Sequence, residues 1–92
     1  MKIRKDQDRY VCITALNIAA FLFAKGEQIA GVNPTDIKGQ KEFVFIRTDR
    51  LDELAEIYKF GDNNDSELLV SIRLIEQARR QLLDRLNDAD KL

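Results

Sequence analysis

The segment KEFVFIR (residues 41–47) carries the strongest β-strand signal of the chain. In an extended strand, Phe43 and Phe45 share one face, and Val44 and Ile46 share the other. Because both faces are apolar, we expect this strand to be central in a sheet or covered on both sides.

A weaker strand and a turn precede this segment. Residues 28–32 (QIAGV) are predicted to form the first strand, although Gly31 weakens it. Residues 33–36 (NPTD) are typical of a turn, and Gly39 is a second break. The two strands therefore make a predicted antiparallel hairpin with a loop of about eight residues, which is longer than usual.

An apolar helix is predicted before the hairpin, over residues 15–25. Asn17 is its only polar residue before Lys25, so the helix should be buried on most sides. Thr14 is the expected N-cap, and Gly26 stands where a left-handed residue commonly ends a helix. We expect this segment to be the core helix of the domain.

A second, amphipathic helix is predicted directly after the hairpin. Thr48 or Asp49 is expected to cap its beginning, and Gly61 to end it. Its apolar positions follow the i, i+3, i+4, i+7 pattern and are Leu51, Leu54, Ala55 and Tyr58. Residues 62–65 (DNND) then form a polar loop, and Asp65 or Ser66 should cap the next helix.

The last predicted helix, residues 66–87, is the longest. Its 22 residues would span roughly 33 Å, about the diameter expected for a domain of this size. Its apolar stripe consists of Leu68, Ile72, Ile75, Leu82 and Leu86, interrupted by Arg79 and widened by Leu69, Ala78 and Leu83. Two interpretations stay open for the far half: Leu82, Leu83 and Leu86 fold back onto the first helix, or they form a partner surface with Arg79.

The predicted fold class is therefore α+β: a helix, a β-hairpin, a helix and a long C-terminal helix packed on a small antiparallel sheet. Residues 14–92 should form a single domain, because a chain of 92 residues has room for one core. Residues 1–13 are predicted to be a basic arm or a short edge strand.

Composition excludes several classes of function. The chain has no histidine and one cysteine, Cys12, so a His-dependent nucleophilic triad, an internal disulfide and a cysteine zinc site cannot be built. We expect Cys12 to be inert in an apolar setting. The apolar run 15–24 is too short to span a bilayer, which needs about 20 residues. The basic start is followed by Asp6 and Asp8, which argues against a signal peptide, so we expect a cytoplasmic protein without membrane contact.

Weak matches to metal and acid–base sites are given structural interpretations. Asp62, Asn64 and Ser66 have the spacing that opens a calcium loop, but Glu67 and Arg73 occupy the positions where that loop needs glycine and glutamate. We interpret residues 62–66 as a helix-capping loop. The carboxylates of the second helix are interpreted as a solvated face; they are Asp49, Asp52, Glu53 and Glu56. No cofactor, metal ion or catalytic residue is predicted.

A nucleic-acid partner is the alternative hypothesis. The candidate phosphate contacts are the basic arm and the arginines of the last helix: Lys2, Arg4, Lys5, Arg73, Arg79, Arg80 and Arg85. Acidic residues interleave with them, and residues 47–67 hold three basic against seven acidic side chains. Such binding would weaken steeply with salt.

Residues 14–26 (TALNIAAFLFAKG) resemble the opening of a small prokaryotic and phage family, domain-of-unknown-function family 5659. In that family an apolar helix with a similar ending precedes a hairpin and a helix with Tyr and Gly near its end, which Tyr58 and Gly61 would match. The resemblance covers about residues 14–86. It implies the same α+β order and brings no catalytic residues.

The leading functional hypothesis is a small non-enzymatic binding or adaptor module. It would act through protein–protein contacts, with another protein or with a second copy of itself through the last helix. A nucleic-acid-associated accessory or regulatory protein is the alternative. An enzyme that works with carboxylates, Tyr and Lys alone is the third, least favoured hypothesis.

Overall fold

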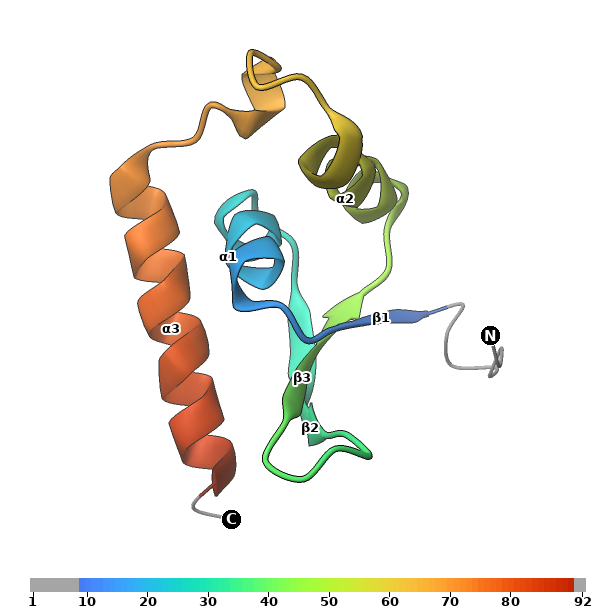
Figure 1. Cartoon of the computed structure of the whole chain (residues 1–92), viewed down its shortest axis with the longest axis vertical. Helices are drawn as coiled ribbons and strands as arrows, with labels where there is room; N and C mark the ends of the chain where they lie inside the picture. Colours follow the sequence, from blue (N-terminus) through green and yellow to red (C-terminus); the bar gives the residue numbers. More distant parts are fainter. Residues whose placement is uncertain (1–8, 91–92) are drawn as a thin grey trace.

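The computed structural model describes residues 9–90 and shows an α+β fold (Figure 1). Its elements, in chain order, are β1 (Tyr10–Ile13), α1 (Leu16–Ala24), β2 (Ile29–Pro34), β3 (Lys41–Ile46), α2 (Asp49–Phe60), the 3₁₀ turn η2 (Ser66–Leu68) and α3 (Ile72–Asp90). The helix α1 lies between α2 and α3, and it contacts both. The predicted fold class and the order of helix, hairpin, helix and long C-terminal helix are confirmed.

The three strands form an antiparallel sheet in the order β1-β3-β2. The segment predicted to be the strongest strand, β3, is therefore central, as expected. Residues 10–13 form an edge strand of this sheet, whereas residues 1–8 of the predicted arm lie outside the described residues. The basic residues Lys2, Arg4 and Lys5 lie outside the described residues.

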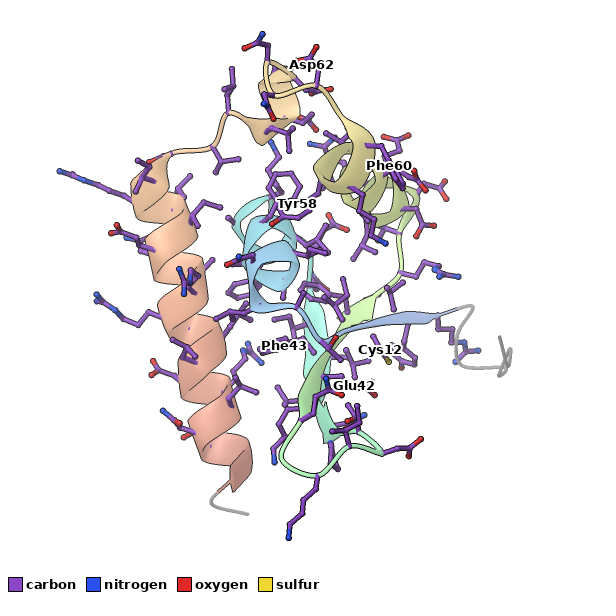
Figure 2. All side chains as sticks on the ribbon, in the orientation of Figure 1. Cys12, Glu42, Phe43, Tyr58, Phe60 and Asp62 are labelled. Atoms are coloured by element: carbon purple, nitrogen blue, oxygen red, sulfur yellow. The ribbon has the colours of Figure 1, made fainter. Side chains whose placement is uncertain are left out.

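The two faces of β3 have different environments. Phe43 and Phe45 are buried in the core with α1, and Val11 of β1 packs on the same side, opposite Phe45. Val44 and Cys12 are paired on the other face, which is directed away from the helices (Figure 2). Cys12 is exposed there, so the predicted apolar setting of this thiol is wrong. The short strand β1 alternates between the two faces and places Cys12 outward.

The loop of the hairpin is shorter than predicted. Pro34 still pairs with Lys41, so β2 extends two residues beyond Val32, and the loop comprises residues 35–40. Proline is tolerated at this position because β2 is an edge strand. Within the loop the Thr35 hydroxyl accepts a 3.1 Å hydrogen bond from the Ile37 amide, and Gly39 adopts a φ of 83°.

The beginning of α1 differs from the prediction, whereas its end agrees with it. Ala15, not Thr14, is the N-cap, and no side chain caps the helix. Pairing of β1 with β3 keeps the chain extended through Ile13, which delays the helix. At the other end Gly26 has a φ of 98°, and the Gly26 and Glu27 amides donate to the carbonyls of Phe23 and Leu22 at 3.0 and 3.1 Å. These two bonds form a Schellman motif.

Replacing Gly26 with alanine should lower the free energy of unfolding by about 1–2 kcal/mol, because an L-residue is strained in the left-handed region. An added Cβ would meet no atom within 4 Å, so the loss would report backbone strain alone. Gly31→Ala is the matched control, since its Cβ also meets nothing and its φ is not positive. Urea unfolding of both variants measures the difference. Equal stability of the two variants would contradict the assigned conformation of Gly26.

The helix α2 begins as predicted. The Thr48 hydroxyl accepts a 2.9 Å hydrogen bond from the Leu51 amide and donates a 2.5 Å hydrogen bond to Glu27 Oε1. The cap therefore also ties the start of α2 to the segment that follows α1. Leu51 and Leu54 are fully buried, and the ring of Tyr58 lies 5.4 Å from that of Phe21.

The last helix begins six residues later than predicted and has 19 residues, about 28 Å of length. The Asp65 carboxylate accepts a 2.9 Å hydrogen bond from the Glu67 amide, which caps the short turn η2 in place of a continuous helix. Leu68 and Val70 then pack against the core while Leu69 is exposed, a pattern of extended chain. α3 packs chiefly against α1, and β2 is the strand that it contacts most.

Candidate partner surface

The inner face of α3 is part of the core. Ala78 and Leu82 are buried against α1, and Ile75 and Leu86 are half-buried on the same side. These residues recur at spacings of three and four, so they form one stripe along the helix. Leu82 is fully buried by its own chain, so it folds back onto α1, the first of the two interpretations left open for it. It is not available as the partner-surface residue that the second interpretation required.

The three C-terminal leucines consequently have different roles. Leu86 packs against the edge of the core, and Leu83 keeps 43% of its surface exposed. Leu83 is one residue, or about 100° of helix rotation, beyond Leu82, which turns it away from α1. Of the predicted leucines, Leu83 is therefore the one that remains available to a partner.

Four residues form what we call the outer face of α3: Ile72, Glu76, Arg79 and Leu83. Ile72 is 74% exposed, and Glu76 and Arg79 are exposed between the two apolar side chains. A shallow hollow of about 390 Å³ lies over this face, lined in part by Glu76, Arg79 and Leu83. The outer face thus combines two apolar ends with a charged centre.

Ile72, which was predicted to belong to the apolar stripe together with Leu68, is a surface residue. The prediction of that stripe assumed one continuous helix from residue 66 onward. The turn η2 and the extended residues 69–71 interrupt it, so Leu68 packs on the core while Ile72 faces solvent. Leu69, also assigned to the stripe, is 70% exposed next to the start of α3.

The arginines of α3 do not gather on one face. The guanidinium of Arg85 lies 5.9 Å from the centre of the Phe23 ring, a cation–π contact that places Arg85 against its own fold. Arg79 belongs to the outer face. Arg73 and Arg80 are seven residues apart and share a third side of the helix, where Asp84 follows four residues after Arg80.

Glu67 connects three elements through ion pairs. Its Oε1 accepts a 3.3 Å hydrogen bond from Lys25 Nζ at the end of α1. Its Oε2 lies 2.6 Å from Arg50 Nη2 in the first turn of α2, an ion pair without aligned hydrogen-bond geometry. Desolvation raises the pKa of Glu67, but the contacts with Lys25 and Arg50 together outweigh it and hold the pKa below its ordinary value. The two ion pairs of Glu67 therefore connect η2 to α1 and to α2.

This lowered pKa predicts a pH dependence of stability. The Glu67 contribution should be complete above the ordinary glutamate pKa of about 4.3 and be lost as the pH falls through the lowered folded-state pKa. We therefore expect wild-type protein to be more stable than Glu67→Gln at neutral pH, with the difference shrinking below about pH 4. Thermal unfolding of both proteins across this range measures it. A pH-independent difference would contradict the ion-pair assignment.

The carboxylates of α2, the remaining candidates for acid–base chemistry, lie on the surface of the protein. Asp49, Asp52, Glu53 and Glu56 are all exposed, as the prediction of a solvated face requires. Between residues 9 and 90 no group of three metal-ligating side chains is found. A second hollow, of about 280 Å³, lies on the side of the sheet that faces away from the helices, with Val44 and Glu42 among its lining residues.

Among the described helices, none has the length and apolar character required to cross a membrane. No protein-family model, curated protein or solved structure matches the chain. The resemblance to domain-of-unknown-function family 5659 stays a prediction.

Proposed function

We propose that this chain is a small non-enzymatic binding module that acts through protein–protein contacts made by the outer face of α3. The observation that carries the proposal is the division of α3 into an apolar inner face and an outer face with an exposed apolar residue at each end. The inner face, with Leu82, fills the core, whereas Ile72 and Leu83 remain in solvent on a different side. Exposed apolar side chains next to charged ones occur at protein–protein contact sites.

The position of α3 also supports this proposal. In Figure 1, α3 lies at one side of the molecule, with α1 next to it and no other labelled element beyond it. All four residues of the outer face are exposed, so a second protein can reach them without any rearrangement of the core. The absence of histidine from the sequence supports a binding role over catalysis.

A photo-crosslinking amino acid at position 83, introduced into the full chain in cells, tests the proposal. We expect discrete protein adducts from position 83, and none from the control position Glu53, which is exposed on α2. The change Ile72→Lys should remove the adducts from position 83, whereas Ile37→Lys, in the hairpin loop, should not. Equal adducts from positions 83 and 53, or adducts insensitive to Ile72→Lys, would contradict the proposed surface.

A further inference from the structure

The spacing of the outer face of α3 is the same when it is read in either direction. The steps from Ile72 to Glu76, Arg79 and Leu83 are four, three and four residues. At 100° per residue, all four positions lie within an arc of about 60° of the helix surface. They form a straight row about 16 Å long, which a second helix could contact along its whole length.

Two copies of such a row match each other when they are antiparallel. A two-fold axis next to the outer face, at the height midway between residues 77 and 78, brings Ile72 of one copy next to Leu83 of the other. The same contact recurs by symmetry. Glu76 is then opposite Arg79 of the second copy, twice. Apolar groups therefore meet apolar groups and each carboxylate meets a guanidinium, as a self-complementary interface requires.

From this match we infer that the partner of the outer face is a second copy of this chain, paired antiparallel through α3. The inference rests on the proposed function and names its partner. A parallel arrangement is disfavoured because it would place Glu76 next to Glu76 and Arg79 next to Arg79. Neither Glu76 nor Arg79 forms an ion pair with another described residue, so both are available for contacts between copies.

A single pair of helices buries an area at the low end of the range for stable protein interfaces. The expected Kd for self-association is therefore in the micromolar range, roughly 1–100 μM. Each dimer contains the 76–79 contact twice, so a charge reversal at either position changes two contacts. We expect Glu76→Arg and Arg79→Glu each to weaken self-association about tenfold or more.

Sedimentation velocity on the full chain, from micromolar to millimolar concentration, tests the inference. Wild-type protein should dimerise, and each charge-reversal variant alone should need a concentration at least about tenfold higher to reach the same dimer fraction. An equimolar mixture of Glu76→Arg and Arg79→Glu should form a heterodimer of near wild-type affinity, because the acidic row of one chain then meets the basic row of the other. Glu53→Arg, on α2, is the control and should dimerise like the wild type.

Cysteine crosslinking tests the antiparallel orientation, with Cys12→Ser as the background. Chains with Ile72→Cys should form disulfides with chains carrying Leu83→Cys, and neither variant should crosslink to itself. The inference would be overturned if Ile72→Cys crosslinked to itself. It would also be overturned if the mixture of Glu76→Arg and Arg79→Glu stayed monomeric, or if either charge variant alone dimerised like the wild type. Monomeric wild-type protein would also overturn it. The proposed function would still hold in that case if position 83 gave adducts with a different protein that Ile72→Lys removes.

Discussion

Replacing Leu82 with alanine should lower the free energy of unfolding by about 2–5 kcal/mol. Leu82 is fully buried between α3 and α1, so the change removes apolar contacts and leaves a cavity. A domain of 92 residues is expected to have a total stability of roughly 5–14 kcal/mol, so this loss is a large fraction of it. Urea unfolding followed by circular dichroism measures the change.

Leu83→Ala is the matched control for Leu82→Ala, because the two residues are adjacent in the same helix and have the same side chain. Leu83 is largely outside the core, and its replacement should change the free energy of unfolding of the monomer by less than about 1 kcal/mol. Measurement at low protein concentration keeps self-association out of the comparison. If the two variants lost equal stability, the assigned rotation of α3 against α1 would be incorrect.

The change Phe45→Ala should have an effect of similar size, about 3–5 kcal/mol. Phe45 is fully buried on the central strand, in register with Val11 of β1 and Ile29 of β2, and it belongs to a core cluster that includes residues of all three α-helices. Its loss would weaken the packing between the two layers. The same urea unfolding experiment measures it.

Ile46→Ala provides the comparison for Phe45, because Ile46 is next to it on β3 and 38% exposed on the other side of the sheet. We expect it to cost about 1 kcal/mol or less. A loss from Ile46→Ala as large as that from Phe45→Ala would show that the outward side of the sheet is covered by something other than the described residues.

The features that the sequence predicted correctly depend on local signals. The apolar run of β3, the Thr48 cap and the left-handed position of Gly26 each need only a few neighbouring residues to be recognised. Predicted boundaries were wrong where pairing between distant segments sets them. Pro34 stays in β2 because Lys41 pairs with it, and α1 starts late because β1 is held by β3.

The candidate surface could be predicted only in part, for a physical reason. Leu82 and Leu83 are equally apolar, and which of them faces α1 depends on the rotation of α3, which the distant helix α1 sets. The exposure of Ile72 depends on the break between η2 and α3, where the Asp65 cap closes a 3₁₀ turn instead of starting a long helix. The periodicity of residues 66–87 does not reveal that break.

Thiol reactivity at two neighbouring positions tests the division of α3 into an inner face and an outer face. Single cysteines at positions 82 and 83, each in the Cys12→Ser background, should be compared under native conditions at a concentration where the chain is monomeric. The cysteine at position 82 should react at least about 100-fold more slowly than the one at position 83, because it reacts only when the structure opens. Equal rates, or faster reaction at position 82, would contradict the assignment of Leu82 to the inner face and of Leu83 to the outer face.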